Sequence, residues 1–131
     1  MSADFENLEV WKRSCRLSID LYRDLKDCKD FGLYSQITRA SVSIPSNIAE
    51  GAERKTPKDF ANFLYIAKGS SAELRTQLYI AGQPGLIPRP EAKKLILECK
   101  VITKMLQGLI NSLGPQTKKL ITDCWLLITA P

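Results

Sequence analysis

The stretch SIPSNIAEG, residues 43–51, places a proline in the middle of a pattern that otherwise predicts a helix. Pro45 has no backbone N–H to donate and its ring crowds the preceding turn, so a proline at this depth ordinarily ends or bends a helix. Yet apolar residues recur at three- and four-residue spacing before and through it, at Leu33, Ile37, Ala40, Ile44 and Ile48. We therefore expect one helix, about 33–54, with a kink at Pro45, in which Ser43, Ser46 and Asn47 satisfy the freed backbone groups.

The same kind of spacing predicts three further helices. The first is expected at about 7–27, and the fourth at about 90–113. The third is expected to begin at Pro57, after an N-cap at Thr56. The predicted core stripes are Leu8, Trp11, Cys15, Ser18, Tyr22 and Leu25 in the first helix; Phe60, Phe63, Ala67, Ser70, Leu74, Leu78 and Ala81 in the third; and Ala92, Leu95, Cys99, Ile102, Leu106, Leu109 and Leu113 in the fourth.

These helices are long and their connections are short. Each spans about 20–26 residues, or roughly 30–39 Å at 1.5 Å per residue. Short connections make consecutive helices antiparallel neighbours. The sequence therefore predicts an all-α fold, an antiparallel up-down-up-down four-helix bundle over residues 1–115. A C-terminal extension of undefined role, residues 116–131, would follow it.

Two helices carry apolar residues outside their predicted core stripes. Val10, Leu17 and Leu21 of the first helix are rotated by about 110° from its stripe, and residues 64–66 lie outside the stripe of the third. Additional apolar stripes indicate another subunit, a partner or a wide core. We favour a homo-oligomer, with Val10, Leu17 and Leu21 in its interface.

A polar stripe runs beside the apolar stripe of the second helix. Glu50 and Arg54 form a favourable i,i+4 pair within it. A solvated face is one interpretation, and a polar seam at a subunit contact or ring axis is the one that we favour. The stripe consists of Gln36, Arg39, Ser43, Asn47, Glu50 and Arg54.

The chain is basic. Nineteen Lys and Arg against fourteen Asp and Glu give a formal net charge of +5, which favours association with polyanions such as nucleic acid, although many basic proteins bind none. Candidate nucleic-acid-binding residues lie after the second helix, along the fourth and on the first. They are Arg54, Lys55 and Lys58; Lys93, Lys100 and Lys104; and Arg13 and Arg16.

The sequence offers little for base-specific recognition. It contains no recognition-helix motif, zinc finger or RNA-stacking signature, so binding is expected to be directed at the phosphate backbone and to depend steeply on salt. Tyr22, Tyr34, Tyr65 and Tyr79 are expected in the core or in an interface, rather than as platforms for base stacking.

Several classes of enzyme and site are excluded by composition. The chain has no histidine, so it has no Ser-His-Asp or Cys-His nucleophile system and no Glu-x-x-His di-iron site. A carboxylate pair, Glu50 and Glu53, is the remaining enzymatic alternative. We expect no enzyme, catalytic residue, cofactor or metal.

The cysteines and hydropathy bear on the compartment. The four cysteines form no CxxC pair, and the N-terminus has no secretory leader, which favours a reduced, cytoplasmic protein. Cys15 and Cys99 are expected in the core. No apolar run approaches the roughly 20 residues that span a bilayer, so no membrane association is expected.

The segments FENLEVWKRS and GLYSQITRASVSIPSNIAEGAERKTPKDFANFLYIAKGSSAELRTQLYIA resemble the bacterial four-helix bundle proteins encoded in intervening sequences of 23S ribosomal RNA genes. The resemblance covers about residues 5–113 and is most specific from Gly32 to Ala81. That family is similar to the accessory variability determinant protein of diversity-generating retroelements. The resemblance implies a ring-shaped homopentamer without recognised catalytic activity. For the retroelement relatives it also implies binding to nucleic acid and to a reverse transcriptase.

This chain departs from the family pattern at Thr38–Arg39, where the family usually has two arginines. The missing arginine weakens the case for phosphate binding by the second helix. Together these observations favour a non-enzymatic oligomeric bundle that binds the backbone of structured RNA or of DNA through basic patches. The alternative is a protein-interaction or assembly scaffold with no direct role for nucleic acid.

Overall fold

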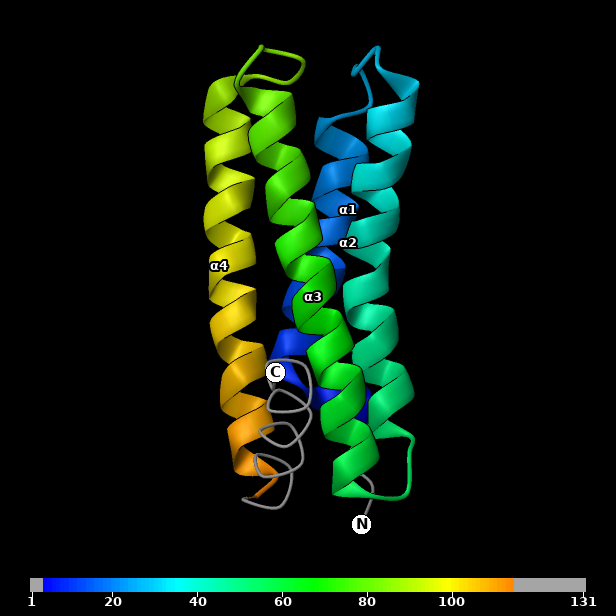
Figure 1. Cartoon of the computed structure of the whole chain (residues 1–131). Coiled ribbons are helices and arrows are strands. Elements are labelled where there is room, and N and C mark those ends of the chain that lie inside the picture. The colour runs from blue at the N-terminus through cyan, green and yellow to red at the C-terminus, as the bar shows by residue number, and fades with distance from the viewer. Residues whose placement is uncertain (1–3, 115–131) are drawn as a thin grey trace, which may run out of the picture.

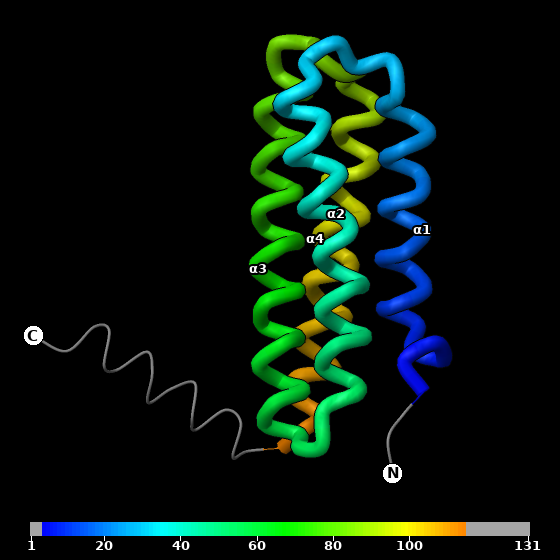
Figure 2. The backbone as a smooth tube through the Cα atoms, turned by 90° about the vertical axis from the view of Figure 1, so that its right-hand side faces the viewer, coloured from blue at the N-terminus to red at the C-terminus, as the bar shows by residue number. Residues whose placement is uncertain are grey.

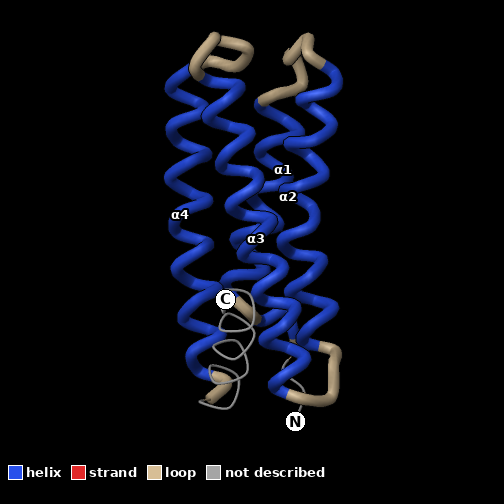
Figure 3. Tube along the Cα trace, viewed as in Figure 1, coloured by secondary structure: helices blue, strands red, loops and turns tan. Residues whose placement is uncertain are grey.

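The computed structural model describes residues 4–114, and within them every regular element is helical (Figures 1 and 3). A 3-10 turn, η1 (Phe5–Asn7), precedes the helices α1 (Glu9–Asp24), α2 (Phe31–Ala52), α3 (Pro57–Gly82) and α4 (Arg89–Ser112). They pack side by side in the cyclic order α1, α2, α3, α4, with α4 returning to α1 (Figure 2). The predicted all-α fold of four helices is confirmed. The extension 116–131 lies outside the described residues.

The helix boundaries follow from capping side chains. The carboxylate of Asp30 accepts a hydrogen bond from the backbone N–H of Leu33 at 3.0 Å, which starts α2 two residues earlier than predicted. Thr56 caps α3 as predicted, because its hydroxyl accepts from the N–H of Asp59 at 3.1 Å and Pro57 takes the first helical position. No helix of the described residues is long and apolar enough to cross a membrane.

The core stripes predicted for the second and fourth helices are largely confirmed. Ile37, Ala40, Ile44 and Ile48 are buried on α2, and Leu33 is half-buried. On α4, the stripe is buried from Ala92 to Leu106, and Leu109 and Leu113 are half-buried. Burial raises the pKa of the Cys99 thiol to about 12, so this cysteine is an inert core residue as expected.

The stripe predicted for the first helix is confirmed at Ser18 and Leu25, which are buried, but the buried face as a whole is rotated from it by about a quarter turn. Trp11 and Cys15 are only half-buried and Tyr22 is exposed. The residues that α1 buries are Val10, Ser14, Leu17, Ser18 and Leu21. Val10, Leu17 and Leu21 therefore lie in the core of the protomer, and their assignment to an oligomer interface is corrected.

Hydrogen-bonded serines explain this rotation. The hydroxyl of Ser14 donates to the carbonyl of Trp11 at 3.0 Å, and the hydroxyls of Ser18 and Ser41 lie 2.9 Å apart between α1 and α2. A buried serine whose hydroxyl is paired costs little and allows close helix approach. Large aromatic residues consequently lie at the flanks. On α3, likewise, Leu64 is fully buried although its sequence position placed it outside the stripe, while Phe60 and Phe63 are half-buried.

Helix α2 continues without interruption through Pro45, whose side chain is buried. The carbonyl that loses its donor is that of Ser41. Of the three predicted partners, Asn47 donates from its side-chain amide to the carbonyl of Ser43 at 2.8 Å, and Ser46 is exposed. None of these three side chains donates to the Ser41 carbonyl, so the prediction that they satisfy the freed backbone group is wrong. A kink at Pro45 stays a prediction.

The substitution Pro45→Ala should restore an N–H that can donate to the Ser41 carbonyl and should straighten the second helix. Proline in a helix interior costs about 3 kcal/mol in isolation, whereas loss of the buried ring costs about 1–2 kcal/mol. We therefore expect a raised thermal midpoint together with a disturbed oligomer, measured by calorimetry and light scattering. An unchanged midpoint with an unchanged oligomer would contradict a geometric role for Pro45.

A close approach of α2 to α3 depends on Gly51. A Cβ atom at this position would lie 2.6 Å from the Cβ of Phe63 and 3.2 Å from the carbonyl oxygen of Phe60. Gly51→Ala should lower the free energy of unfolding by about 1–2 kcal/mol, since overpacking outweighs the gain in helix propensity. Gly108→Ala is the matched control, because a Cβ there meets nothing within 4 Å. It should raise stability by up to about 1 kcal/mol. Equal effects of the two substitutions in denaturant titrations would refute the close approach.

Candidate nucleic-acid interface

Positive charge is concentrated on α4. This helix carries five lysines and arginines against two glutamates, whereas α2 carries one of each sign, Arg39 and Glu50. All five cationic side chains of α4 are exposed. They are Arg89, Lys93, Lys94, Lys100 and Lys104. We call these five residues the α4 basic surface.

The structure brings two of the predicted basic groups together. Arg13 of α1 lines a shallow hollow of about 480 Å³ on the outer side of α4, together with Lys93 and Lys94. Leu97 and Val101 line the same hollow and are exposed apolar residues. Of the predicted basic residues, Arg13 of the first helix and Lys93 of the fourth therefore lie on one surface.

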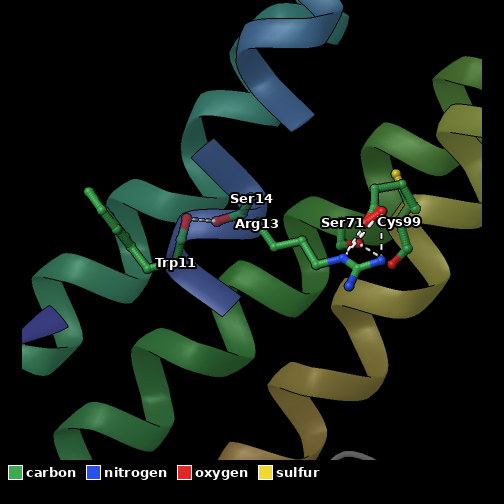
Figure 4. Close-up of polar contacts among 6 residues, drawn as sticks. Trp11, Arg13, Ser14, Ser71 and Cys99 are labelled. Carbon is green, nitrogen blue, oxygen red and sulfur yellow. Dashed lines mark hydrogen bonds and ion pairs between the residues drawn. The ribbon is translucent and has the colours of Figure 1, made fainter. Parts of the chain in front are cut away.

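Arg13 is not a free cation. Its guanidinium donates to the carboxylate of Glu98 on α4, with Nη2 3.2 Å from Oε2 (Figure 4). This hydrogen bond and the charge of Glu98 raise the pKa of Arg13. Among residues 4–114 it is the one ion pair that joins two helices, because the others lie within α1 or join α2 to the turn that follows it. Arg13 consequently fixes α1 against α4.

Arg16 lies in a second hollow, the α1–α4 groove, of about 550 Å³. Its floor is apolar, with Leu17 and Leu95. Its four cations are nearly balanced by three carboxylates. The cations are Lys12, Arg13, Arg16 and Lys94, and the carboxylates are those of Glu9, Asp20 and Glu98. This balance makes the groove a weaker attractor for a polyanion than the outer side of α4.

The predicted cluster after the second helix lies away from the N-terminal part of the α4 basic surface. The turn that joins α2 to α3 lies at the other end of the bundle from the start of α4 (Figure 1). Arg54 is also engaged there, because it donates to Glu50 at 2.8 Å and its guanidinium lies 4.8 Å from the centre of the Phe63 ring. Lys55 and Lys58 are exposed at the start of α3.

Part of the predicted polar stripe pairs within the protomer. The hydroxyl of Ser43 lies 2.9 Å from that of Ser70 on α3, and Asn47 donates to Ser43. Gln36, Arg39 and Glu50 are exposed. Ser43 and Asn47 therefore lie at the junction of α2 and α3, whereas the rest of the stripe is exposed in the protomer, where it forms a solvated face and a seam between subunits stays a prediction.

Sequence reasoning missed a third hollow, the α3–α4 groove, of about 360 Å³. It combines the aromatic ring of Tyr79 with three cations and no carboxylate. Its lining residues are Leu78, Tyr79, Gly82, Gln83, Arg89, Ala92, Lys93, Ile96, Leu97 and Lys100. Tyr79 is 46% exposed, so it does not lie in the core of the protomer, and its alternative place in an interface stays a prediction. The signal was its position directly after Leu78 of the core stripe, since a rotation of about 100° turns a side chain to the helix flank.

A solved structure supports this fold. The chain is similar to a protein of unknown function from the S23 ribosomal protein family of Bacteroides thetaiotaomicron, with 25% sequence identity and a TM-score of 0.74. The match covers 78% of this chain and 98% of that chain. No curated protein matches this chain.

The family model described as 23S rRNA-intervening sequence protein matches residues 6–108. This range includes all of α1, α2 and α3 and most of α4. The chain therefore belongs to the 23S rRNA-intervening sequence protein family.

Proposed function

We propose that the protein is a non-enzymatic, oligomeric bundle that binds the backbone of structured RNA or of DNA through the α4 basic surface. The observation that carries this proposal is the unbalanced charge of α4. It has five cations against two carboxylates, and one of these carboxylates, Glu98, is engaged with Arg13. The five cations of α4 are therefore not balanced by carboxylates of the same helix.

Backbone contact is the mode that these side chains favour. Four of the five are lysines, which are compact point charges that neutralise phosphates without reading bases. Binding by charge neutralisation releases counterions, so affinity falls steeply as salt rises. A single α4 surface carries few charges. Repetition of the surface in an oligomer would convert weak contacts into useful avidity.

Exposed apolar side chains support such an assembly, and they lie on two different faces. On α1 and α2, Ile19 and Val42 directly follow the hydrogen-bonded Ser18 and Ser41, and both are exposed. On α3, Ile66 and Ile80 are exposed, and because they are two heptads apart they lie near the same side of the helix. Two unlike faces suit a heterologous contact between protomers, which closes into a ring when the rotation permits. The family resemblance suggests a ring of five.

An assembly scaffold is the second candidate function, and the same exposed apolar faces favour it. In that case a partner protein would cover one of them. By analogy with the retroelement relatives, a reverse transcriptase is a candidate partner. The basic charge of α4 would then be incidental to its activity.

Removal of two charges from α4 should weaken nucleic-acid binding. For Lys100→Gln with Lys104→Gln, we expect the slope of log affinity against log salt to become shallower by about 1–2, since each phosphate contact contributes about 0.7–0.9. The measurement is fluorescence anisotropy of labelled RNA across a salt series. The control is Lys26→Gln with Lys29→Gln, two exposed lysines of the turn between α1 and α2, which should leave the slope unchanged. Absence of RNA binding at low salt by the folded wild-type protein would refute the proposal.

A charge on the outward face of α3 should break the oligomer. Ile66 is 51% exposed in the protomer, so Ile66→Lys costs little in a monomer and much in a buried contact. We expect light scattering to report a smaller particle with an unchanged helical circular-dichroism spectrum. Leu86→Lys, in the turn between α3 and α4, is the control and should assemble normally. A wild-type monomer, or an I66K particle of wild-type mass, would contradict the assigned face.

A further inference from the structure

We propose that the α3–α4 groove holds one unstacked nucleotide of a single-stranded nucleic acid. Its base would lie against Tyr79 and Leu97, and its phosphate would lie at Lys93 and Lys100. This inference rests on the proposed nucleic-acid function and specifies which form of nucleic acid the protein prefers. Three features of the groove carry it.

The floor of the groove is apolar and is formed by a close helix approach. A Cβ atom at Gly82 would lie 2.7 Å from the Cβ of Ala92, so α3 and α4 can come this near only because residue 82 is a glycine. Leu78, Ala92 and Ile96 form the rest of the floor and are buried. The α3–α4 groove is therefore a defined hollow of about 360 Å³ with little polar surface at its base.

The sides of the groove expose apolar side chains that a planar ring can cover. Tyr79 of α3 is 46% exposed, and Leu97 of α4 is 52% exposed. An aromatic face in a basic groove is the usual platform for an unpaired base, and stacking on it tolerates any base. Contact with a base would remove both side chains from water.

The charge of the groove is complementary to phosphate. Arg89, Lys93 and Lys100 line it, and no carboxylate does. Arg89 donates from Nη2 to the carbonyl of Gln83 at 2.9 Å, which ties it to the end of α3, whereas the two lysines have no hydrogen bond or ion pair among the described residues. Of the three hollows described here, the α3–α4 groove is the one that has an aromatic ring and the one that has no carboxylate.

This combination discriminates between strands. In a duplex the bases are paired and stacked on each other, so they cannot reach Tyr79, whereas a single strand can splay one base into the groove. Lysines elsewhere on α4 would contact either form equally. The groove therefore predicts a preference for single-stranded over double-stranded nucleic acid that depends on the ring of Tyr79.

The test compares binding of labelled single-stranded oligouridine and of an RNA duplex of equal length at one salt concentration. Tyr79→Ala should weaken oligouridine binding about fivefold or more, which corresponds to the ~1 kcal/mol lower bound for stacking of one base. Its duplex affinity should stay within about twofold of wild type, because stacking does not contribute there. Tyr79→Phe keeps the ring and should bind both ligands as the wild type does. Tyr79 is exposed, so circular dichroism should report an unchanged fold for both variants.

The outcomes separate the inference from the proposed function. If Lys100→Gln with Lys104→Gln weakens binding but Tyr79→Ala has no effect, or weakens duplex and single strand alike, the proposed function stands and the groove assignment is overturned. If polyglutamate displaces oligouridine and loses affinity for the Tyr79→Ala variant in the same measure, the groove takes an acidic peptide and the inference is also overturned. If the wild type binds neither nucleic acid, both proposals fall.

Discussion

The bundle depends on small residues that set the distance between its helices. Gly51 lies against Phe60 and Phe63, Gly82 lies against Ala92, and paired serine hydroxyls fill the contact between α1 and α2. A further pair, the hydroxyls of Ser71 and Thr103, lies 3.0 Å apart between α3 and α4. Leucine, isoleucine and alanine make up most of the remaining interior. Among the described residues, no aromatic side chain is fully buried.

The displaced aromatic residues explain what the sequence could and could not predict. The existence of the helices, the cap of α3 and the stripes of α2 and α4 follow from spacing and from Thr56 and Pro57, because the cores of α2 and α4 are aliphatic, whereas the Asp30 cap of α2 was not predicted. The orientation of α1 could not be predicted from spacing. The line through Trp11 and Tyr22 contains more apolar residues than the line that α1 buries, which contains two serines. The periodicity of a sequence does not show whether a serine hydroxyl has a hydrogen-bond partner on another helix.

The candidate site could likewise be predicted from spacing only in part. Lys93, Lys100 and Lys104 were identified from their position opposite a regular core stripe, and they are exposed there. The engagement of Arg13 by Glu98 joins residues 85 positions apart, so it appears only once α1 and α4 are packed. The α3–α4 groove likewise requires the close approach at Gly82, which brings Tyr79 beside Lys93 and Lys100. Tight packing thus creates both the core and the surface features that we connect with function.

Assembly and nucleic-acid binding together form the central claim, and one measurement reports both. Multi-angle light scattering of the purified full-length protein, with absorbance recorded at the maxima of nucleic acid and of protein, gives particle mass and bound nucleic acid at once. We predict a mass that is a multiple of the 14.7 kDa protomer, with excess nucleic-acid absorbance that disappears at high salt. A particle of protomer mass, with the absorbance ratio of protein alone at low salt after RNA is added, would contradict the claim.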